Sequence, residues 1–385
     1  MKYLVIGDAS SMHIYNFVKS VLLPAGYEVH LLTLSNLPVR DSFRLFYAEN
    51  SVIVHSIAEK GYNNVEKNDK FHRVLNILRK LRLMKEIRDI DVCHVQSVYK
   101  TAMVMILQNK KRFKHLILSY WGGDVEDTTT SVIKLREKAF KLADVITVTT
   151  EKTLQDVREI HGDKYDNKLR ISRFATDGIN CIHRLSETVT RDECRQSYNI
   201  PSEKICITCG YSAYKEQHQD RCIEIIKTLP DDIRAKICVI VPMQYGRFDA
   251  AYIERVTKLA ASCDFPCHVL HEYVPFEKSA MLAIATDIYL HLRDTDAFSN
   301  ALKEHVYAGS VVITGKWLKY IELENMHAPM RSIENFDELE EVLLDTITLY
   351  RIPDSIELFA PIYEMYSADS VKAQWIKTIE AAIGD

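Results

Sequence analysis

The stretch from Ile288 to Ile313 constrains the fold more than any other part of the sequence. It carries an apolar run, a turn rich in Asp, Thr and Ser, a helical pattern and a second apolar run. Short apolar runs bounded by turn residues are typical of buried strands. This order places a helix N-terminus at the carboxyl edge of a parallel sheet, where anionic ligands bind in open α/β folds. We therefore predict an α/β fold with an anion site near Ser299 and Asn300.

Two carboxylates flank the start of this helix. Asp296 precedes it, and Glu304 lies eight positions further on, one to two turns inside the helical pattern. A ligand at the mouth of the site can then meet one carboxylate while the other binds hydroxyl groups deeper along the same helix.

This arrangement resembles the acid-x7-acid signature of GT-B glycosyltransferases, including glycosyltransferase family four. The matching positions are Asp296, Phe298, Glu304, Ala308 and Gly309. The first acid is Asp where the family usually has Glu, which shortens its reach by one methylene. The resemblance implies two Rossmann-like, doubly wound domains facing a cleft. The alternative for this stretch is an ordinary Rossmann-type helix with a polar cap.

The chain has 385 residues, too many for one hydrophobic core, so two domains are expected. The resemblance implies an acceptor-binding domain at 1–180 and a nucleotide-sugar-binding domain at 181–365. The last segment, 366–385, is helical by its apolar spacing and can return to the first domain. The polar segment Asp177–Asp192 is the expected crossing between the domains.

Composition places the protein among soluble globular chains, with 47% hydrophobic and 26% charged residues and no apolar run long enough to span a membrane. No signal peptide is evident. Nine cysteines lie mostly within apolar runs, as expected of buried thiols in a reducing compartment. We expect a cytoplasmic protein, peripheral on the inner face of the plasma membrane if it binds lipid.

The formal charge of −4 conceals an asymmetry between the two halves. Residues 1–170 carry 27 Lys and Arg against 20 Asp and Glu, a net charge of +7, and the remainder carries 22 against 33, a net charge of −11. A basic first half is suited to an anionic surface or substrate. Basic residues are not interleaved with aromatic ones, so nucleic-acid binding is not expected.

A basic helix is predicted at 70–88. Its apolar positions recur at helical spacing, and its other side is rich in Lys and Arg. Such a helix can lie on an anionic bilayer. The alternative is a domain helix that packs its apolar face on the sheet and leaves a solvated basic face. The apolar positions are Phe71, Val74, Leu75, Leu78 and Leu81.

The first domain offers two candidate acceptor loops. A strand at Lys2–Ile6 runs into a Gly-Asp turn without the G-x-G-x-x-G fingerprint, which disfavours a dinucleotide site. In GT-B enzymes this loop borders the acceptor site, so the resemblance makes Gly7, Ser10, Ser11 and His13 candidates. A simple polar turn and helix cap is the alternative.

The second candidate loop, Trp121-Gly122-Gly123-Asp124, follows another strand. Trp121 stands where many GT-B relatives have His, and this loop is similar to that of the dTDP-4-acetamido-fucose transferases of enterobacterial common antigen synthesis. An acid at such a loop tip can activate an acceptor hydroxyl. We therefore assign Trp121 to acceptor binding and Asp124 to catalysis.

The second domain carries the candidate donor loop after a strand at Lys204–Thr208. A glycine followed by small and polar residues can wrap backbone N–H groups around phosphate. GT-B relatives use an Arg and Lys pair here, but no Arg follows the glycine, so Lys215 and His218 would do more of that work. The donor candidates in this loop are Gly210, Tyr211, Ser212, Lys215 and His218.

The resemblance adds further donor residues outside this loop. Tyr245 lies in a segment similar to the common-antigen transferases, Val274 lies in a turn that flanks the nucleotide base in GT-B proteins, and Phe298 belongs to the signature itself. Asp294-Thr295-Asp296 is also a D-x-D tripeptide, which in the other glycosyltransferase fold holds a metal. Its place before the acid-x7-acid helix favours the metal-independent fold, so no metal and no cofactor are expected.

These features predict a metal-independent, hexosyltransferase-like enzyme that moves a sugar from a nucleotide-diphospho-sugar to a saccharide or lipid-linked saccharide. Lys215 and the helix N-terminus would stabilise the departing diphosphate. Glu304 would accept hydrogen bonds from the ribose hydroxyls, and Asp296 would orient the sugar or balance the charge of an oxocarbenium-like transition state. Two alternatives remain open: a nucleotide-sugar epimerase of the same fold, and a non-catalytic sugar-nucleotide-binding subunit of a polysaccharide assembly complex.

Overall fold

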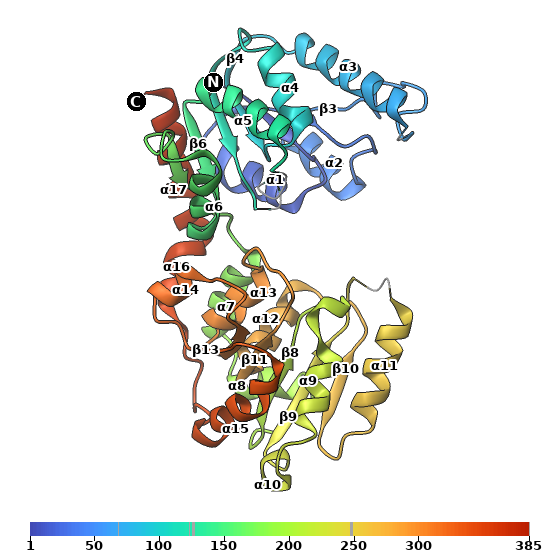
Figure 1. The fold of residues 1–385 in the computed structure, drawn as a ribbon, viewed down its shortest axis with the longest axis vertical. Helices are drawn as coiled ribbons and strands as arrows, with labels where there is room; N and C mark the ends of the chain where they lie inside the picture. The colour runs from blue at the N-terminus through green and yellow to red at the C-terminus, as the bar shows by residue number, and fades with distance from the viewer. Residues whose placement is uncertain (68, 123, 125–127, 247–248, 385) are drawn as a thin grey trace. The chain divides into compact units, whose positions relative to one another are not determined.

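The computed structural model describes residues 1–385 except 68, 123, 125–127, 247–248 and 385. The chain folds into two compact α/β units (Figure 1). The first unit consists of Met1–Ala175 and Ala368–Asp385, and the second consists of Thr176–Ser367. Each unit is built on one parallel sheet, which confirms the predicted fold class.

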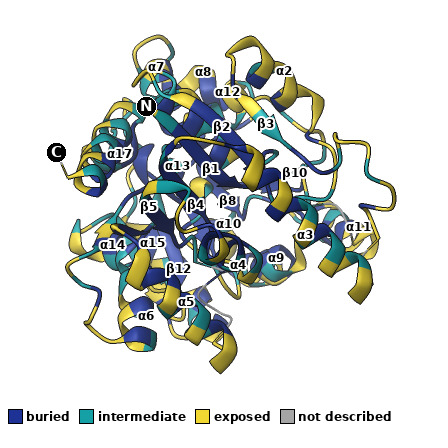
Figure 2. Cartoon of the chain, turned by 90° about the horizontal axis from the view of Figure 1, so that it is seen from above, coloured by how far each residue is buried: buried dark blue, intermediate teal, exposed yellow. Residues whose placement is uncertain are grey.

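The sheet of the first unit has the strand order β3-β2-β1-β4-β5-β6-β7, and all of its pairings are parallel. Its central strands are buried on both faces, as expected of a sheet covered by helices on each side (Figure 2). The strands are β1 (Lys2–Gly7), β2 (Glu28–Thr33), β3 (Ile53–His55), β4 (Ile90–Gln96), β5 (Phe113–Ser119), β6 (Val145–Val148) and β7 (Leu169–Ile171).

Alternate residues of β1 enter two separate cores, because successive side chains of a strand point to opposite faces. Leu4 and Ile6 pack with α3, α4 and α5, whereas Tyr3 and Val5 pack with α1, α2 and α17. The helices of this unit are α1 (Met12–Phe17), continued by the π-helical turn η1 (Val18–Leu22), α2 (Asp41–Glu49), α3 (Lys70–Glu86), α4 (Lys100–Gln108), α5 (Thr130–Leu142), α6 (Glu151–His161) and α17 (Ala368–Ile383).

The sheet of the second unit has the strand order β10-β9-β8-β11-β12-β13, again parallel throughout. One face carries α7, α8, α12, α13 and α16, and the other carries α9, α10, α11 and α15. The strands are β8 (Ile205–Cys209), β9 (Ile237–Pro242), β10 (Cys267–Leu270), β11 (Ile288–His291), β12 (Val311–Gly315) and β13 (Met330–Ile333).

Most helices of the second unit connect consecutive strands, as in other doubly wound folds. They are α7 (Asp177–Ser186), α8 (Arg191–Gln196), the 3₁₀ turn η2 (Lys215–Gln217), α9 (Gln219–Ile226), α10 (Asp231–Arg234), α11 (Ala250–Ala261), α12 (Phe276–Ala285), α13 (Asn300–Tyr307), α14 (Ile321–Asn325), the 3₁₀ turn η3 (Phe336–Glu338), α15 (Leu339–Leu349) and α16 (Ala360–Tyr366).

The C-terminal helix α17 belongs to the first unit. Trp375 is buried in that unit's core, and its indole N–H donates to the carbonyl of Arg173 over 2.8 Å. The Thr378 hydroxyl lies 2.9 Å from that of Ser172. The second unit begins at Thr176, just before the segment expected to cross between the domains, and that segment is mostly helical, with α7 capped by Thr176 and followed by α8.

The basic helix α3 buries a different face from the one its apolar spacing suggested. Phe71, Val74 and Leu78 are 70%, 54% and 57% exposed. Asn76 and Lys80 are buried instead, since the Asn76 amide donates to the Val65 carbonyl and the Lys80 ammonium lies against the segment at 34–36. The expectation that the apolar face packs on the sheet is therefore wrong for these three residues. Among the described residues, no helix has the length and apolarity of a membrane span.

A buried charge cluster fastens α8 to the second sheet. The Asp287 carboxylate is fully buried and accepts hydrogen bonds from Arg191, from Arg195 at 2.8 Å and from the Cys206 N–H at 2.6 Å. Because the two guanidinium groups are buried as well, loss of the carboxylate leaves uncompensated charge in the core.

We expect Asp287→Asn to lower the free energy of unfolding by about 3–5 kcal/mol, the usual cost of breaking a buried ion pair. The matched control is Asp264→Asn, which removes a 2.8 Å ion pair with Arg234 whose carboxylate side is 65% exposed. That change should cost less than about 1 kcal/mol. Urea denaturation of both variants measures the difference, and equal losses would contradict this role for Asp287.

Candidate functional site

The strand order reverses direction once in each sheet, and ligands of open α/β folds bind at such a point. In the second unit the reversal lies between β8 and β11, which pair in parallel. The loop after β8 and the loop after β11 therefore leave the sheet side by side. These are the two loops to which the sequence assigned most of the donor residues.

The loop after β8 turns at Gly210, whose φ is +66°. A Cβ atom at this position would lie 2.5 Å from the Gln217 side-chain oxygen, so no larger residue fits. Gln217 accepts a hydrogen bond from the Tyr211 N–H at 2.9 Å and donates to the Ser212 hydroxyl at 2.6 Å. The Ser212 side chain is buried within the loop. Gln217 was not predicted from the sequence, and its side chain stabilises this loop by hydrogen bonds to Tyr211 and Ser212.

The two loops are bonded to each other. The Asp294 N–H donates to the Glu216 carbonyl at 3.2 Å, and the His218 ring lies 2.7 Å from the Asp294 carboxylate. Arg293 donates to the Tyr211 hydroxyl and places its guanidinium over the Tyr211 ring, 5.4 Å from the ring centroid. The loops therefore form a single surface. Arg293 is a site residue that the sequence did not signal, because its contact is with a residue 82 positions away.

Asp296 lies inside this surface, and its side chain is only 3% exposed. Its carboxylate accepts hydrogen bonds from the Ser299 N–H at 2.8 Å, the Tyr320 hydroxyl at 2.9 Å and the His291 ring at 3.2 Å. Burial alone would raise the pKa of Asp296, but these hydrogen bonds outweigh it and lower the pKa to about 2. The two acids of the D-x-D tripeptide have separate partners, so they do not converge on one point.

Helix α13 begins directly after Phe298, which has a φ of +67°. A left-handed backbone at a bulky residue costs free energy and is common at functional sites. The Phe298 ring is buried between Tyr320 and Tyr366, at centroid distances of 5.6 and 5.7 Å. The buried ring of Phe298 therefore anchors the loop that leads into α13. Asn300, at the first position of α13, is exposed.

Glu304 lies on α13 against the start of α7. A Cβ atom on Gly178 would come within 2.0 Å of the Glu304 carboxylate, so glycine makes room for it. No hydrogen bond or ion pair to this carboxylate is found among the described residues. Loss of solvent raises the pKa of Glu304 to about 7, with Asp177 adding to the effect and Lys303 opposing it.

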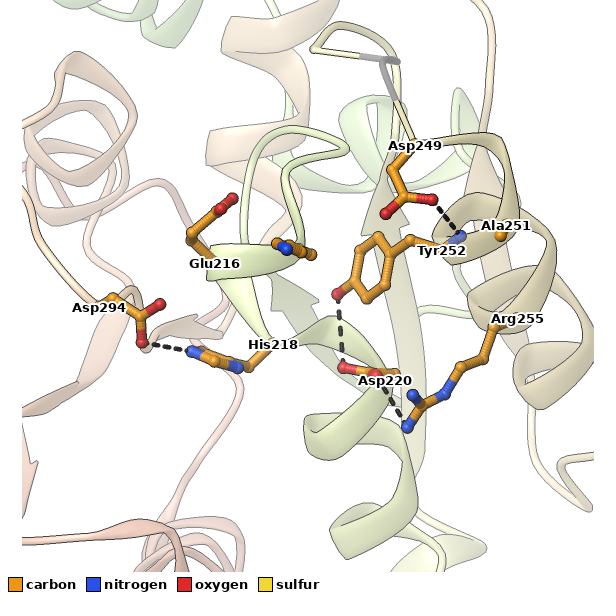
Figure 3. Close-up of a pocket in the computed structure, with 9 residues that line it drawn as sticks. Glu216, His218, Asp220, Asp249, Ala251, Tyr252, Arg255 and Asp294 are labelled. Atoms are coloured by element: carbon orange, nitrogen blue, oxygen red, sulfur yellow. Dashed lines mark hydrogen bonds and ion pairs between the residues drawn. The ribbon is translucent and has the colours of Figure 1, made fainter.

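Lys215 and His218 face a pocket of about 480 Å³ on the α9 and α11 side of these loops (Figure 3). Its other described lining residues are mostly paired: the Tyr252 hydroxyl points to Asp220, and Arg255 lies 2.9 Å from the same carboxylate. Lys215 is exposed at the rim. Among the described lining residues, none comes from the start of α13.

The remaining donor candidates lie in neighbouring loops. Tyr245 is 46% exposed, and its carbonyl accepts a hydrogen bond from the Ala213 N–H at 2.8 Å. Its ring lies 6.1 Å from that of Tyr211. Val274 lies between β10 and α12 and is partly exposed. Tyr245 therefore adjoins the loop after β8, whereas the role of Val274 remains a prediction.

In the first unit, the strand order reverses between β1 and β4. An aromatic cluster lies at the carboxyl ends of these strands. The His13 ring lies 5.4 Å from the Trp121 ring and 4.7 Å from the Phe174 ring, and the Trp121 indole N–H donates to Gln96 at 3.1 Å. The structure thus brings His13 and Trp121 together and adds Gln96 and Phe174, which the sequence did not signal.

The other acceptor candidates lie in the turn after β1. Gly7 is a packing glycine, since a Cβ atom there would lie 2.3 Å from Ile14. The Ser10 hydroxyl accepts a hydrogen bond from the Arg40 N–H at 3.1 Å. Ser11 precedes α1 without capping it through its side chain. Gly7 and Ser10 therefore have structural roles in this turn.

Asp124 does not lie at an exposed loop tip as expected. It is 1% exposed, and each carboxylate oxygen accepts two hydrogen bonds. One oxygen binds the Ser97 hydroxyl at 2.9 Å and the Val98 N–H at 3.0 Å. The other binds the N–H groups of Trp121 and Gly122 at 2.9 and 3.1 Å. Asp124 therefore clamps this loop, and its geometry does not support acceptor activation.

Comparisons with known proteins agree with the fold. Residues 2–150 match the family model described as "Glycosyl transferase 4-like". A search of the curated proteins found no significant sequence match.

Solved structures that resemble this chain are glycosyltransferases or related sugar enzymes. HepE of Anabaena, in complex with UDP and glucose, has a TM-score of 0.67 at 12% identity, with 99% of this chain and 100% of that chain covered. A glycosyltransferase from Rickettsia africae has a TM-score of 0.71 at 11% identity, over 100% and 99%. Sucrose-phosphate synthase from Thermosynechococcus elongatus has a TM-score of 0.69 at 12% identity, over 99% and 98%. The expected GT-B fold is thereby confirmed.

We expect the raised pKa of Glu304 to make stability depend on pH. The folded protein retains the proton that the unfolded chain releases near pH 4.5, so the free energy of unfolding should fall as the pH rises from about 4.5 to 7 and then level off. Glu304→Gln should remove this slope, measured by urea denaturation from pH 5 to 8. Glu364→Gln, at an exposed position of α16, is the control. An unchanged slope in Glu304→Gln would contradict the assigned environment.

Proposed function

We propose that this GT-B glycosyltransferase moves a sugar from a nucleotide-diphospho-sugar to a saccharide or lipid-linked saccharide acceptor in cell-surface polysaccharide synthesis. The donor is assigned to the β8–β11 edge of the second unit and the acceptor to the β1–β4 edge of the first. One observation carries the donor assignment: a glycine turn, a helix N-terminus and the Glu304 carboxylate, which has no hydrogen-bond or ion-pair partner among the described residues, occur at a single sheet edge.

The chemistry of this edge suits a nucleotide diphosphate. The exposed start of α13 offers free N–H groups and the positive end of a helix dipole to an anion. Glu304 lies further along the same helix, where its carboxylate can accept hydrogen bonds from ribose hydroxyls. An ionised carboxylate that accepts two hydroxyl donors is favoured over the protonated form, so donor binding would lower the pKa of Glu304. HepE, of similar fold, binds UDP and glucose, which supports a donor of this class.

The aromatic cluster of the first unit supports a sugar acceptor. Trp121, His13 and Phe174 present ring edges and faces beside the Gln96 amide. Aromatic rings with a few polar groups are typical of small-molecule sites. Negative charge that builds up on the departing diphosphate would be stabilised in the second unit, and the first unit would hold the acceptor.

A lipid-linked acceptor is supported by helix α3. Its exposed stripe, Phe71, Val74 and Leu78, recurs at three- and four-residue intervals, and each of these side chains is more than half exposed. By helical spacing, Arg82 and Lys85 continue the same face, and both are exposed. Apolar side chains beside cations are complementary to an anionic bilayer, where each basic residue contributes about 1 kcal/mol.

The donor proposal is tested by calorimetric titration with UDP-, GDP-, dTDP- and CMP-sugars. We expect one of them to bind, and Glu304→Ala to raise its Kd at least tenfold, because a charged hydrogen bond contributes about 1.5–3 kcal/mol. Gly178→Ala should weaken binding as well by displacing the Glu304 carboxylate. Glu364→Ala is the control, and wild-type affinity in Glu304→Ala would count against the assignment.

Transfer itself is tested with the labelled donor and a membrane lipid extract. A transferase forms a labelled lipid-linked product and leaves the sugar unchanged when the extract is omitted. An epimerase converts the donor alone, and a non-catalytic subunit does neither. Either of these last results would overturn the proposed reaction.

The membrane proposal concerns the exposed stripe of α3. Replacing Phe71, Val74 and Leu78 together by Ser should reduce co-sedimentation with phosphatidylcholine–phosphatidylglycerol vesicles at least fivefold. The matched control replaces Leu37, Leu45 and Ile53, which are also exposed apolar residues of the first unit. Equal losses in the two triple variants would show that the stripe has no special role.

A further inference from the structure

Arg293 holds a fixed position at the end of β11. Its backbone carbonyl accepts a hydrogen bond from the Trp317 indole N–H at 2.6 Å. Its guanidinium lies over the Tyr211 ring, donates to the Tyr211 hydroxyl and approaches the Asp296 carboxylate to 3.5 Å. The side chain is 23% exposed, so it reaches the surface where the loops after β8 and β11 meet.

Two buried donor atoms next to Tyr211 have no hydrogen-bond partner in the part of the chain that the structure describes. One is the Nε of Arg293, and the other is the hydroxyl of Ser299. The Ser299 side chain also lies close to the Tyr211 hydroxyl, although no hydrogen bond of good geometry joins them. Buried polar groups in folded proteins are nearly always hydrogen-bonded, so a pair of unpartnered donors at one place indicates a missing acceptor.

The charge around these donors favours an anion. Ser299 is the N-cap residue of α13, whose N-terminus carries partial positive charge. Arg293 adds a full charge in a planar fork that matches phosphate oxygens. One oxygen of Asp296 accepts from the Ser299 N–H, Tyr320 and His291, and the other faces Arg293 at 3.5 Å, so a bound anion would compete with a single long ion pair.

Lys215, the cation expected from the sequence, stands in a different environment. Its pocket is lined by four acids, Glu216, Asp220, Asp249 and Asp294, and by one further Arg or Lys side chain, Arg255 (Figure 3). Asp220 pairs with Arg255 and Asp294 with His218, but Glu216 and Asp249 have no ion pair among the described residues, and they would repel a diphosphate placed in that pocket. The acids around Lys215 therefore make its pocket less favourable for a diphosphate than the start of α13.

We infer that Arg293, together with the Ser299 hydroxyl and the first N–H groups of α13, binds the diphosphate of the donor. This inference rests on the proposed function, since it assigns a residue to the same donor site. Arg293 exchanges its contacts with Tyr211 and Asp296 for phosphate oxygens, and its unpartnered Nε and the Ser299 hydroxyl gain acceptors. The cation that binds the leaving group thus comes from the loop after β11 and not from the loop after β8.

The test compares nucleoside diphosphates with the matching nucleosides. UDP, GDP and dTDP are titrated into wild-type protein, and the one that binds is used with its nucleoside on each variant. Arg293→Gln should raise the Kd of the diphosphate at least tenfold and change that of the nucleoside less than twofold. Arg293→Lys should be intermediate, because it keeps the charge and loses the fork.

One control variant and two further variants sharpen the comparison. Arg221→Gln removes another guanidinium stacked on an aromatic ring, 4.2 Å from the Phe336 centroid, and should leave both Kd values unchanged. Lys215→Gln should raise the diphosphate Kd less than Arg293→Gln does. Ser299→Ala should weaken the diphosphate and spare the nucleoside.

Three results would overturn the inference while leaving the proposed function intact. Arg293→Gln could bind the diphosphate as tightly as wild type, or Lys215→Gln could show the larger loss. Equal weakening of diphosphate and nucleoside would mean that Arg293 only maintains the fold of the loop. If wild-type protein binds none of the three diphosphates, the proposed function itself fails.

Discussion

The candidate donor site depends on one buried carboxylate. Asp296 accepts hydrogen bonds from the N–H of Ser299, from Tyr320 and from His291, and these interactions join the end of β11, the start of α13 and the segment before α14. Burial and the nearby Asp296 charge together raise the pKa of Tyr320 above its ordinary value, which keeps the hydroxyl protonated as a donor. With this hub in place, the first N–H groups of α13 and the guanidinium of Arg293 are held at one edge of the sheet.

The strand order reverses once in each unit, but the residues gathered at the two reversals differ in their chemistry. In the second unit, the reversal between β8 and β11 brings together a glycine turn, a helix N-terminus, Arg293 and the Glu304 carboxylate, a set that suits a charged nucleotide. In the first unit, the reversal between β1 and β4 brings together Trp121, His13, Phe174 and Gln96, a set with little charge. Because of this difference in chemistry, we assign the donor to the second unit and the acceptor to the first.

Much of the fold could be predicted because burial in parallel sheets leaves simple patterns. The apolar run at 288–292 is β11 to within one residue, and the helix expected at 299–307 is α13 (Asn300–Tyr307). The direction of side chains could not be predicted in the same way. The sequence predicts Asp124 as an acid at a loop tip, but its carboxylate is buried and accepts hydrogen bonds from four nearby donors.

Helix α3 and Arg293 are two further cases in which the sequence alone did not predict the position of side chains. Spacing identified an apolar stripe on α3, but the buried face was decided by distant groups, such as the Val65 carbonyl that binds Asn76. Arg293 lacks any local motif, and only the pairing of β8 with β11 brings it to Tyr211. Both cases depend on contacts between segments far apart in the chain, about which local periodicity says nothing.

The most direct test of the central claim is a crystal structure with a bound nucleoside diphosphate. We predict phosphate oxygens at the Arg293 guanidinium, the Ser299 hydroxyl and the first N–H groups of α13, and ribose hydroxyls within hydrogen-bond distance of the Glu304 carboxylate. A nucleotide bound to the first unit, or one in the second unit whose ribose makes no contact with Glu304, would contradict it.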